Sequence, residues 1–459
     1  MVEIRINDIL QLGISDMTVN GDGIGKTADG YPLFVGGAVP GDTVRARITK
    51  LNKTYGFARI EKIEIPSEHR VSPPCPHFEK CGGCSIMHTD YASQLEIKKN
   101  LVVSNLAKIG GCDRGSYAFE GIIGADNIFG YRNKAQFPVG ISADGNMAVC
   151  GFYEKSSHRI VPCDDCLIQD ESINKTVRII MDFINKYSLG VYDEKSHKGM
   201  VRHIYVRTGK DGSVMAAIVT NSRKKIPHAD ELAQMLIKAV NLKSLVQNIN
   251  SAKGNVVLGC ENLLLWGNGS ITAEIGGIEY VMSPNSFFQV NYEQMRKLYS
   301  KAKEYAALSG NETLFDLYCG VGSISLFMAD AAEKVIGVEI VEPAVENAKL
   351  NAQKNGIGNA EFYCGDCPEA VSALVESGVC ADVVVVDPPR KGCDERTLKL
   401  IDEISPDRLV YVSCNSSTLA RDVKILRGYG YEIKKCCAVD LFPHSMHVET
   451  IVLLQNRNM

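Results

Sequence analysis

The chain has 459 residues, of which 45% are hydrophobic and 23% are charged, and its formal net charge is −4. This length predicts about three domains at roughly 150 residues each, and the charge excludes a globally basic, histone-like protein while allowing a nucleic-acid enzyme with a local basic groove. No apolar run approaches the ~20 residues of a membrane helix, and the first residues lack the apolar core of a signal peptide. We therefore expect a cytoplasmic protein with no membrane partner.

Residues 1–65 alternate short β-like runs with glycine-rich turns. The runs at 33–35, 42–48 and 55–60 show the period-two pattern of half-buried strands, and several short strands at this spacing predict a small barrel. Gly23-Ile24-Gly25-Lys26 and the turn at 38–42 resemble a TRAM domain, a five-stranded barrel related to the OB fold. The resemblance implies RNA binding by this segment. Phosphate contacts could come from Arg45, Arg47, Lys50, Lys53 and Arg59, unless these are ordinary solvated charges.

Three cysteines, Cys75, Cys81 and Cys84, follow a proline-marked linker and lie within ten residues. In a long chain without a signal peptide, a set of 16 cysteines favours metal binding or catalysis over disulfides. Iron–sulfur cages usually take four thiolates, and Cys163 and Cys166 are the candidates for the fourth. A structural zinc site could use the same residues. The spacing favours iron–sulfur over zinc, and it differs from the Cys-x3-Cys-x2-Cys triplet of radical S-adenosylmethionine enzymes.

The central segment, residues 66–282, is expected to be an α+β domain that holds this metal site. Apolar residues recur at helical spacing from 91 to about 110, which predicts an amphipathic helix that could pack on the following domain. The remainder, from about 117, reads as strand-rich. Basic groups there are interleaved with aromatic residues, which suits single-stranded RNA, although each such pair alone is more often a solvated surface.

Residues 283–459 show the pattern of a cofactor-binding α/β unit. After a predicted helix at 292–307, a strand at 313–317 runs into the glycine turn of Gly320 and Gly322. The next strand ends in Glu339, 19 residues beyond Gly320, which matches the ~20-residue spacing of an acid that binds ribose hydroxyls. The Asp-x-x-x-Gly-x-Gly pattern resembles motif I of S-adenosylmethionine-dependent methyltransferases. This resemblance implies a Rossmann-like fold with Asp366 beside the adenine.

Two later strands end in polar turns. The apolar run 381–386 ends in Asp387-Pro388-Pro389-Arg390, and the run 409–413 ends in Cys414-Asn415 before a predicted helix. The carboxyl edge of an open α/β sheet is where such folds build their sites, and a helix amino terminus favours a thiolate. Cys414 is therefore a candidate nucleophile. The alternative is a buried structural cysteine.

Taken in order, these motifs resemble the RNA uracil-5-methyltransferase family over nearly the whole chain. Further carriers of the resemblance are Phe287-Phe288-Gln289-Val290-Asn291 and the stretch from Leu441 to Glu449. The TRAM-like start and the cysteine triplet resemble the members that modify 23S ribosomal RNA, whereas the transfer-RNA members usually lack both. We expect a multi-domain α/β protein with a TRAM/OB-like barrel at 1–65, an iron–sulfur α+β domain at 66–282 and a Rossmann-like methyltransferase domain at 283–459.

The family resemblance implies a mechanism. Cys414 adds to C6 of uracil in 23S ribosomal RNA, C5 takes the methyl group from S-adenosyl-L-methionine, and Glu449 removes the C5 proton. The uridine must leave its stack or lie in a single-stranded loop. For Glu449 the alternative is a structurally paired carboxylate. The implied cofactor-binding residues are Gln289, Tyr318, Glu339, Asp366 and Asp387, with Asp387 between cofactor and uracil.

The same resemblance implies a 4Fe-4S cluster on Cys75, Cys81, Cys84 and Cys166, because the family places its fourth cysteine in a Cys-x-Ile context. Cys163 remains the alternative fourth ligand. The chemistry needs no electron, so we expect the cluster to be structural or to help hold RNA, and we expect a monomer. Competing hypotheses are a transfer-RNA uracil-5-methyltransferase and a non-catalytic RNA-binding iron–sulfur protein. A cytosine-5 enzyme is disfavoured because it commonly carries its nucleophile beside a proline.

Overall fold

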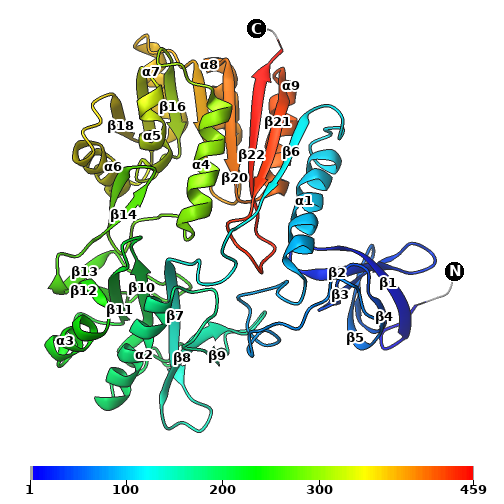
Figure 1. Ribbon diagram of the computed structural model, residues 1–459, viewed down its shortest axis with the longest axis vertical. Helices are drawn as coiled ribbons and strands as arrows, with labels where there is room; N and C mark the ends of the chain where they lie inside the picture. The colour runs from blue at the N-terminus through cyan, green and yellow to red at the C-terminus, as the bar shows by residue number, and fades with distance from the viewer. Residues whose placement is uncertain (1–3, 458–459) are drawn as a thin grey trace.

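Five strands form a closed barrel at the amino-terminal end of the computed structural model, which describes residues 4–457 (Figure 1). The barrel order is β1-β2-β3-β5-β4. Side chains alternate inward and outward, and the inward ones of β4, Val44, Ala46 and Ile48, are fully buried. The expected small barrel is therefore present. Its strands are β1 (Ile9–Met17), β2 (Asp22–Lys26), β3 (Pro32–Gly36), β4 (Thr43–Leu51) and β5 (Gly56–Ile65).

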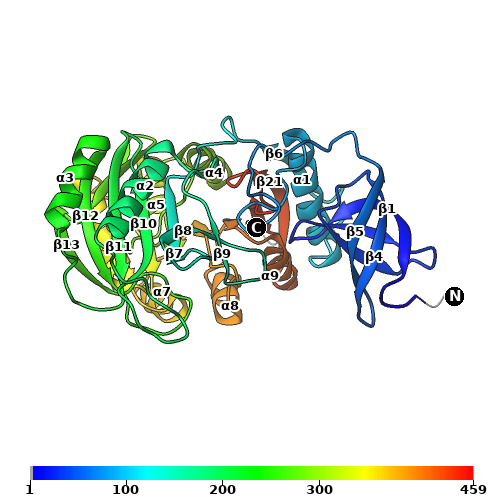
Figure 2. The same ribbon diagram turned by 90° about the horizontal axis from the view of Figure 1, so that it is seen from below.

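A seven-stranded sheet of order β13-β12-β11-β10-β7-β8-β9 lies at the opposite end of the molecule from the barrel (Figure 2). Helices α2 (Glu171–Lys186) and α3 (Ala229–Ala239) cover one face of it, although the sequence reads as strand-rich here. The helices bury apolar residues at helical spacing. The strands are β7 (Lys134–Ile141), β8 (Ala148–Tyr153), β9 (Ile160–Pro162), β10 (Val201–Thr208), β11 (Ser213–Thr220), β12 (Asn241–Ile249) and β13 (Glu261–Gly267).

An eight-stranded sheet of order β18-β17-β16-β19-β20-β22-β21-β6 carries the methyltransferase motifs. Its first five strands are parallel, whereas β22 runs antiparallel to both β20 and β21. Apart from the edge strand β18, which is partly exposed, the parallel strands are buried on both faces, as in doubly wound folds. The strands are β16 (Thr313–Leu317), β17 (Lys334–Glu339), β18 (Ala360–Cys364), β19 (Val383–Val386), β20 (Arg408–Ser413), β21 (Tyr431–Val439), β22 (Glu449–Asn456) and β6 (Ala118–Ile123).

Two elements from the first third of the chain belong to this sheet structurally. Strand β6 pairs in parallel with β21 at the sheet edge, and helix α1 (Tyr91–Lys108) packs against α9 (Ser416–Gly428) (Figure 1). Asp90 caps α1 by accepting a hydrogen bond from the Ser93 amide. The amino-terminal part of the chain is thereby anchored to the last strands of the sheet.

Helices cover both faces of the eight-stranded sheet and form two apolar cores. One core involves α4, α5 and α6 together with the hairpin β14–β15, and the other involves α1, α7, α8 and α9. Within residues 4–457, no helix is both long and apolar enough to cross a membrane. The remaining bounds are β14 (Ile271–Ile275), β15 (Ile278–Met282), α4 (Tyr292–Ala306), α5 (Ser323–Met328), the 3-10 helix η1 (Ala329–Ala331), α6 (Glu342–Lys354), α7 (Cys367–Glu376), α8 (Glu395–Ile404) and α9 (Ser416–Gly428).

Candidate active site

Cys414 and Glu449 meet at one edge of the eight-stranded sheet. Cys414 follows the end of β20, and Glu449 is the first residue of β22. Because the two strands are antiparallel, with Ser413 opposite Thr450, the end of one lies beside the start of the other. Asp387 follows the neighbouring parallel strand β19 and lies at the same edge. The thiol and the two carboxyl groups are thus gathered where the sequence motifs end.

The charges at this edge act on one another. Burial raises the pKa of Glu449 to about 8, with a contribution from Asp387, while Arg390 opposes the rise. Burial and the neighbouring carboxyl Asp316 raise the pKa of Asp387 to about 7. The Glu449 residue is 1% exposed. Near neutral pH a proton therefore resides on Glu449 for much of the time, which suits a group that exchanges protons near that pH.

The thiol of Cys414 is harder to ionise than a free thiol. Burial raises its pKa to about 11, and the carboxylates of Glu449 and Asp387 add to this rise, while Arg390 lowers it. The expected thiolate-favouring influence of the adjacent helix amino terminus is outweighed, because burial and two negative groups act against it. An incoming substrate or a pH change has to displace this balance before Cys414 reacts as a thiolate.

The start of α9 fixes Arg390. The Asn415 side chain caps the helix by accepting from the Ser417 amide at 3.0 Å, and its amide nitrogen donates to the Arg390 carbonyl at 3.2 Å. The hydroxyl of Thr418 donates to the same carbonyl at 3.1 Å. These bonds tie the loop after β19 to the turn after β20 and fix the backbone of Arg390. Arg390 is the cation that lowers the pKa of Cys414.

The glycine turn after β16 and the end of β17 form a second half of this edge. The amides of Gly320 and Val341 donate to the Glu339 carboxylate at 3.1 and 2.9 Å, which fixes that carboxylate at the strand end. Tyr318 has a positive φ of 67°, and its hydroxyl is 3.0 Å from the Thr397 hydroxyl. A Cβ on Gly322 would approach the Phe362 ring to 2.9 Å, so only glycine allows this close packing.

Two other residues expected to bind the cofactor, Asp366 and Gln289, lie in different segments of the chain. Asp366 directly precedes α7 and forms an ion pair with Arg396 at 2.7 Å, and its charge, like that of Glu339, raises the pKa of the buried Cys367 thiol. Gln289 lies instead in the segment before α4, where its carbonyl accepts from the Asn133 side chain at 3.1 Å. The Gln289 side chain makes no hydrogen bond within the described part of the chain. No hydrogen bond therefore joins Gln289 to Tyr318 or Glu339 among residues 4–457.

One buried carboxyl in this region was not predicted. Asp316, the acid that begins the glycine motif, is fully buried on β16 and accepts a hydrogen bond from Ser325 at 2.5 Å, while its other oxygen has no hydrogen-bond partner among residues 4–457. Burial raises its pKa to about 7, and Glu339 contributes to the rise. The sequence pattern that could have predicted this buried carboxyl is an acid inside an otherwise apolar strand.

Five cysteines help to line a cavity of about 270 Å³ between residues 75–87 and residues 163–169, the segment after β9. Its lining includes Cys75, Cys81, Cys84, Cys163 and Cys166. Burial and the neighbouring thiols raise the pKa of Cys84 to about 12. Cys163 donates a hydrogen bond that lowers the pKa of Cys166 to about 7, so Cys166 is the more readily ionised of that pair. Within residues 4–457, no three His, Cys, Asp or Glu side chains converge closely enough to hold a single metal ion.

The chain matches known proteins over nearly its whole length. The sequence profile of the tRNA (Uracil-5-)-methyltransferase family matches residues 90–457, and that of the TRAM domain matches residues 6–60. The chain belongs to the tRNA (uracil-5-)-methyltransferase family. Proteins named as uncharacterized RNA methyltransferases from Clostridium tetani and Halalkalibacterium halodurans are 44% and 43% identical to it. The matches cover 99% and 98% of this chain and 97% and 98% of the relatives.

A solved structure from the family has the same architecture. The Pyrococcus abyssi tRNA (uracil-54, C5)-methyltransferase, in complex with S-adenosyl-L-homocysteine, is 29% identical and superposes with a TM-score of 0.76. The match covers 97% of this chain and 100% of the other. Membership in the family confirms the TRAM barrel and the Rossmann-like methyltransferase fold. The protein is an S-adenosylmethionine-dependent RNA (uracil-5-)-methyltransferase, and its substrate is RNA.

Proposed function

We propose that this enzyme methylates C5 of a uridine in 23S ribosomal RNA through a covalent adduct on Cys414, with Glu449 as the base. The observation that carries the mechanism is the meeting of Cys414 and Glu449 at the β20–β22 edge, beside Asp387 and Arg390. A nucleophile beside a base in one buried site is the arrangement that covalent catalysis followed by proton removal requires.

In the proposed reaction, the Cys414 thiolate forms a bond to C6, which gives C5 the electron density to accept a methyl group. S-adenosylmethionine supplies that group as an electrophilic methyl on a sulfonium. Glu449 then takes the C5 proton, the C5–H electron pair restores the C5–C6 double bond, and the bond from sulfur to C6 breaks. Arg390 offsets the negative charge that Cys414, Asp387 and Glu449 concentrate at this edge.

The turn around Gly320 fits the methyl donor. Glu339, held by two backbone amides, presents its carboxylate where an acid at a strand end binds ribose hydroxyls. Tyr318 and Asp366 flank the same turn and are proposed to contact the donor. Gln289 lies in the segment before α4, and we propose that it contacts the donor from there. Asp387 is proposed to lie between the donor and the uracil.

The cysteine cavity fits an iron–sulfur cluster better than a single zinc ion. A cage holds its thiolates around a volume, whereas a zinc ion draws them to one point, and here the thiols line a cavity without converging. The Gly83 amide donates to the Cys81 sulfur at 3.4 Å, a bond that favours a thiolate. We propose Cys75, Cys81, Cys84 and Cys166 as the ligands of a structural 4Fe-4S cluster.

The barrel is proposed to bind single-stranded RNA through an aromatic platform, which we define as Phe34, Tyr55 and Phe57. Phe34 stacks on Tyr55 with ring centroids 5.2 Å apart, and Phe57 meets each of them at 5.7 Å. Lys26 and Lys50 project from strands beside the platform and are exposed. Neither forms an ion pair with a described residue. Stacking rings beside unpaired cations suit bases and phosphates respectively. Arg47 and Arg59 instead pair with Glu61.

Transfer RNA is the second candidate substrate, because the Pyrococcus abyssi neighbour is named for uracil-54 of tRNA. That match covers 97% of this chain and so includes the barrel, which means that a barrel alone does not separate the two substrates. Mass mapping of RNA from a strain that lacks this protein distinguishes them. We expect 5-methyluridine to disappear from 23S ribosomal RNA. Its loss from transfer RNA alone would overturn the substrate proposal.

The mechanism has its own test with purified protein, RNA and S-adenosylmethionine. Cys414→Ala should abolish both methylation and the covalent protein–RNA adduct seen on a denaturing gel. Glu449→Gln should form the methylated adduct and fail to release it, because only the proton-removal step is blocked. Methylation by Cys414→Ala would sink the mechanism, and Cys260→Ser, at an exposed cysteine away from the site, serves as the control.

A further inference from the structure

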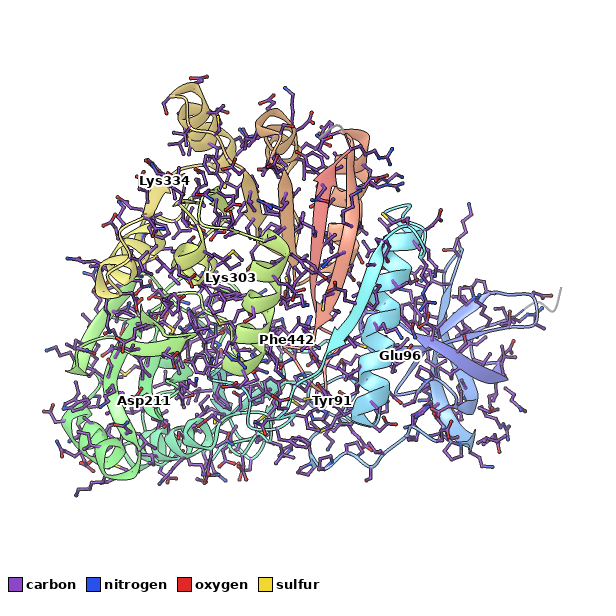
Figure 3. All side chains as sticks on the ribbon, turned by 45° about the horizontal axis from the view of Figure 1, so that its top comes forward. Tyr91, Glu96, Asp211, Lys303, Lys334 and Phe442 are labelled. Carbon is purple, nitrogen blue, oxygen red and sulfur yellow. The ribbon has the colours of Figure 1, made fainter. Side chains whose placement is uncertain are left out.

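The segment 440–448 joins β21 to β22 and leads directly to Glu449. It is held by a fully buried ion pair from the amino-terminal part of the chain. The Lys98 ammonium, on α1, lies 2.6 Å from the Asp440 carboxylate, and both side chains are 0% exposed. Lys98 also donates to the Phe442 carbonyl at 3.0 Å, and the Tyr91 hydroxyl donates to Asp440 at 2.9 Å. Figure 3 shows Tyr91 on α1 and Phe442 on the neighbouring segment.

A second pair of contacts comes from Gln94, one turn from Lys98 on the same helix face. The His444 amide donates to the Gln94 side-chain oxygen at 2.9 Å, and the Gln94 side-chain nitrogen lies 3.2 Å from His444 Nδ1. His444 has a positive φ of 69°, a conformation that most side chains avoid. The surrounding contacts are what hold this residue there.

A third set of contacts comes from Ser85, the residue after Cys84. The amides of Ser85 and Ile86 both donate to the His444 carbonyl, at 2.9 and 3.0 Å. The Met446 amide donates to the Ser85 hydroxyl at 3.1 Å. The cysteine-rich segment therefore ends in a direct clamp on the residues that precede Glu449.

We propose that Lys98 and Ser85 are positioning residues for the proton-removal step, because they fix the 440–448 segment that carries Glu449. The inference rests on the proposed role of Glu449 as the base. Cys414 and Asp387 follow the ends of central parallel strands, so the sheet itself sets their positions. Glu449 is the first residue of its strand and pairs with Val439, the last residue of β21, so the 440–448 segment begins and ends beside the base. Loosening that segment displaces the base and leaves the thiol in place.

Because the base is displaced while the thiol stays in place, the proposal predicts which step of the reaction slows. The bond from Cys414 sulfur to C6 and the transfer of the methyl group to C5 proceed as before. Removal of the C5 proton, which restores the C5–C6 double bond and expels the Cys414 thiolate, becomes slow. A displacement of about 1 Å at a catalytic group costs up to about 100-fold in rate. The methylated adduct therefore accumulates, and proton removal limits turnover.

The test uses the full-length protein carrying its cluster, S-adenosylmethionine, and an RNA substrate with hydrogen or deuterium at uracil C5. The variants are Ser85→Ala, which removes one hydroxyl, and the double change Lys98→Met with Asp440→Asn, which removes both buried charges together. The control is Lys99→Met, since this neighbouring lysine of α1 forms its ion pair with Glu96, an exposed residue of the same helix. Melting temperature and cluster absorbance are measured for every variant.

We expect each positioning variant to lower turnover by about tenfold or more, to accumulate the methylated adduct, and to acquire a deuterium isotope effect that Lys99→Met lacks. Wild-type turnover overturns the proposal. So does an equal fall in adduct formation and turnover without an isotope effect, which is the signature of a merely structural role. If the double variant unfolds, Ser85→Ala decides. Failure of the underlying mechanism is recognised separately, by methylation in Cys414→Ala.

Discussion

Glu449 combines a buried position with the negative charge that its proposed role as a base requires. Its pKa is raised to about 8 in the folded protein, chiefly by burial, against a usual value of 4.5. Between these two pH values the folded state keeps a proton that the unfolded chain has lost. The contribution of Glu449 to the free energy of unfolding is therefore fully present below about pH 4.5 and is lost as the pH rises through about 8. The proposed base costs stability in the pH range in which it can accept a proton.

This linkage predicts the effect of Glu449→Gln on unfolding. The glutamine stays neutral, so the variant should be more stable than the wild type at pH 9 by on the order of 2–4 kcal/mol, and the difference should shrink toward pH 5. Denaturant unfolding at several pH values measures it. Glu346→Gln, at an exposed position of α6, is the control and should show no such trend. A stability difference that does not change with pH contradicts the assignment of a buried, ionisable Glu449.

At the scale of single elements, the barrel is the part of the chain that we propose to bind RNA without taking part in catalysis. Its inward side chains form a separate apolar core, and its outward side chains include the aromatic platform. Phe34 and Phe57 are register partners on the parallel strands β3 and β5, which is why their rings meet. Tyr55 lies in the turn before β5 and is 36% exposed, so its ring is available to a base.

We predict that Tyr55→Ala weakens RNA binding by about tenfold, since stacking of one base contributes about 1–3 kcal/mol. Tyr55→Phe keeps the ring and should bind as the wild type does. Turnover at saturating RNA should be unchanged in both variants, because the barrel does not contribute to the Cys414 site. Titration of a labelled RNA at fixed salt gives the Kd values. Equal affinity for Tyr55→Ala and Tyr55→Phe would show that bases do not stack there.

At the scale of the whole molecule, distant parts of the chain converge on the β20–β22 edge. Strand β6 and helix α1 attach the amino-terminal third to the methyltransferase sheet. Met17 of the barrel, Ile86 of the cysteine-rich segment and Met446 of the segment before Glu449 form one small apolar cluster. Loss of order in the cysteine-rich segment should therefore spread to the active site through packing.

Cys81→Ser tests this connection. We expect the variant to lose the absorbance of the proposed cluster, to melt at a lower temperature and to lose methylation in parallel with folding. The reason is that a cage usually needs four thiolates, and Cys81 is one of the four proposed. Cys260→Ser, outside the cavity, should change none of these properties. Chemical oxidation or reduction of the wild-type cluster should leave the methylation rate unaltered as long as the fold persists. A rate that follows the redox state in an intact fold contradicts a structural role.

The sequence alone predicted features that are encoded locally. Alternation of apolar residues indicated the barrel strands, and the glycine turn with an acid 19 residues later indicated the Rossmann-like unit. The residues between about 117 and 285 were harder, since helices α2 and α3 lie within a strand-rich stretch and pack by tertiary contacts. Propensity in short elements is weak, and packing decides their final form.

The sequence by itself predicted Cys414 at the end of a strand, and the family resemblance alone pointed to Glu449. Only the tertiary structure brought them together, because the antiparallel insertion of β22 between β20 and β21 sets their register. The Lys98–Asp440 pair likewise joins residues that no local pattern connects. Local periodicity reports which face of an element is buried, whereas the pairing of distant elements depends on how the whole core packs. That pairing placed the proposed base beside the proposed nucleophile.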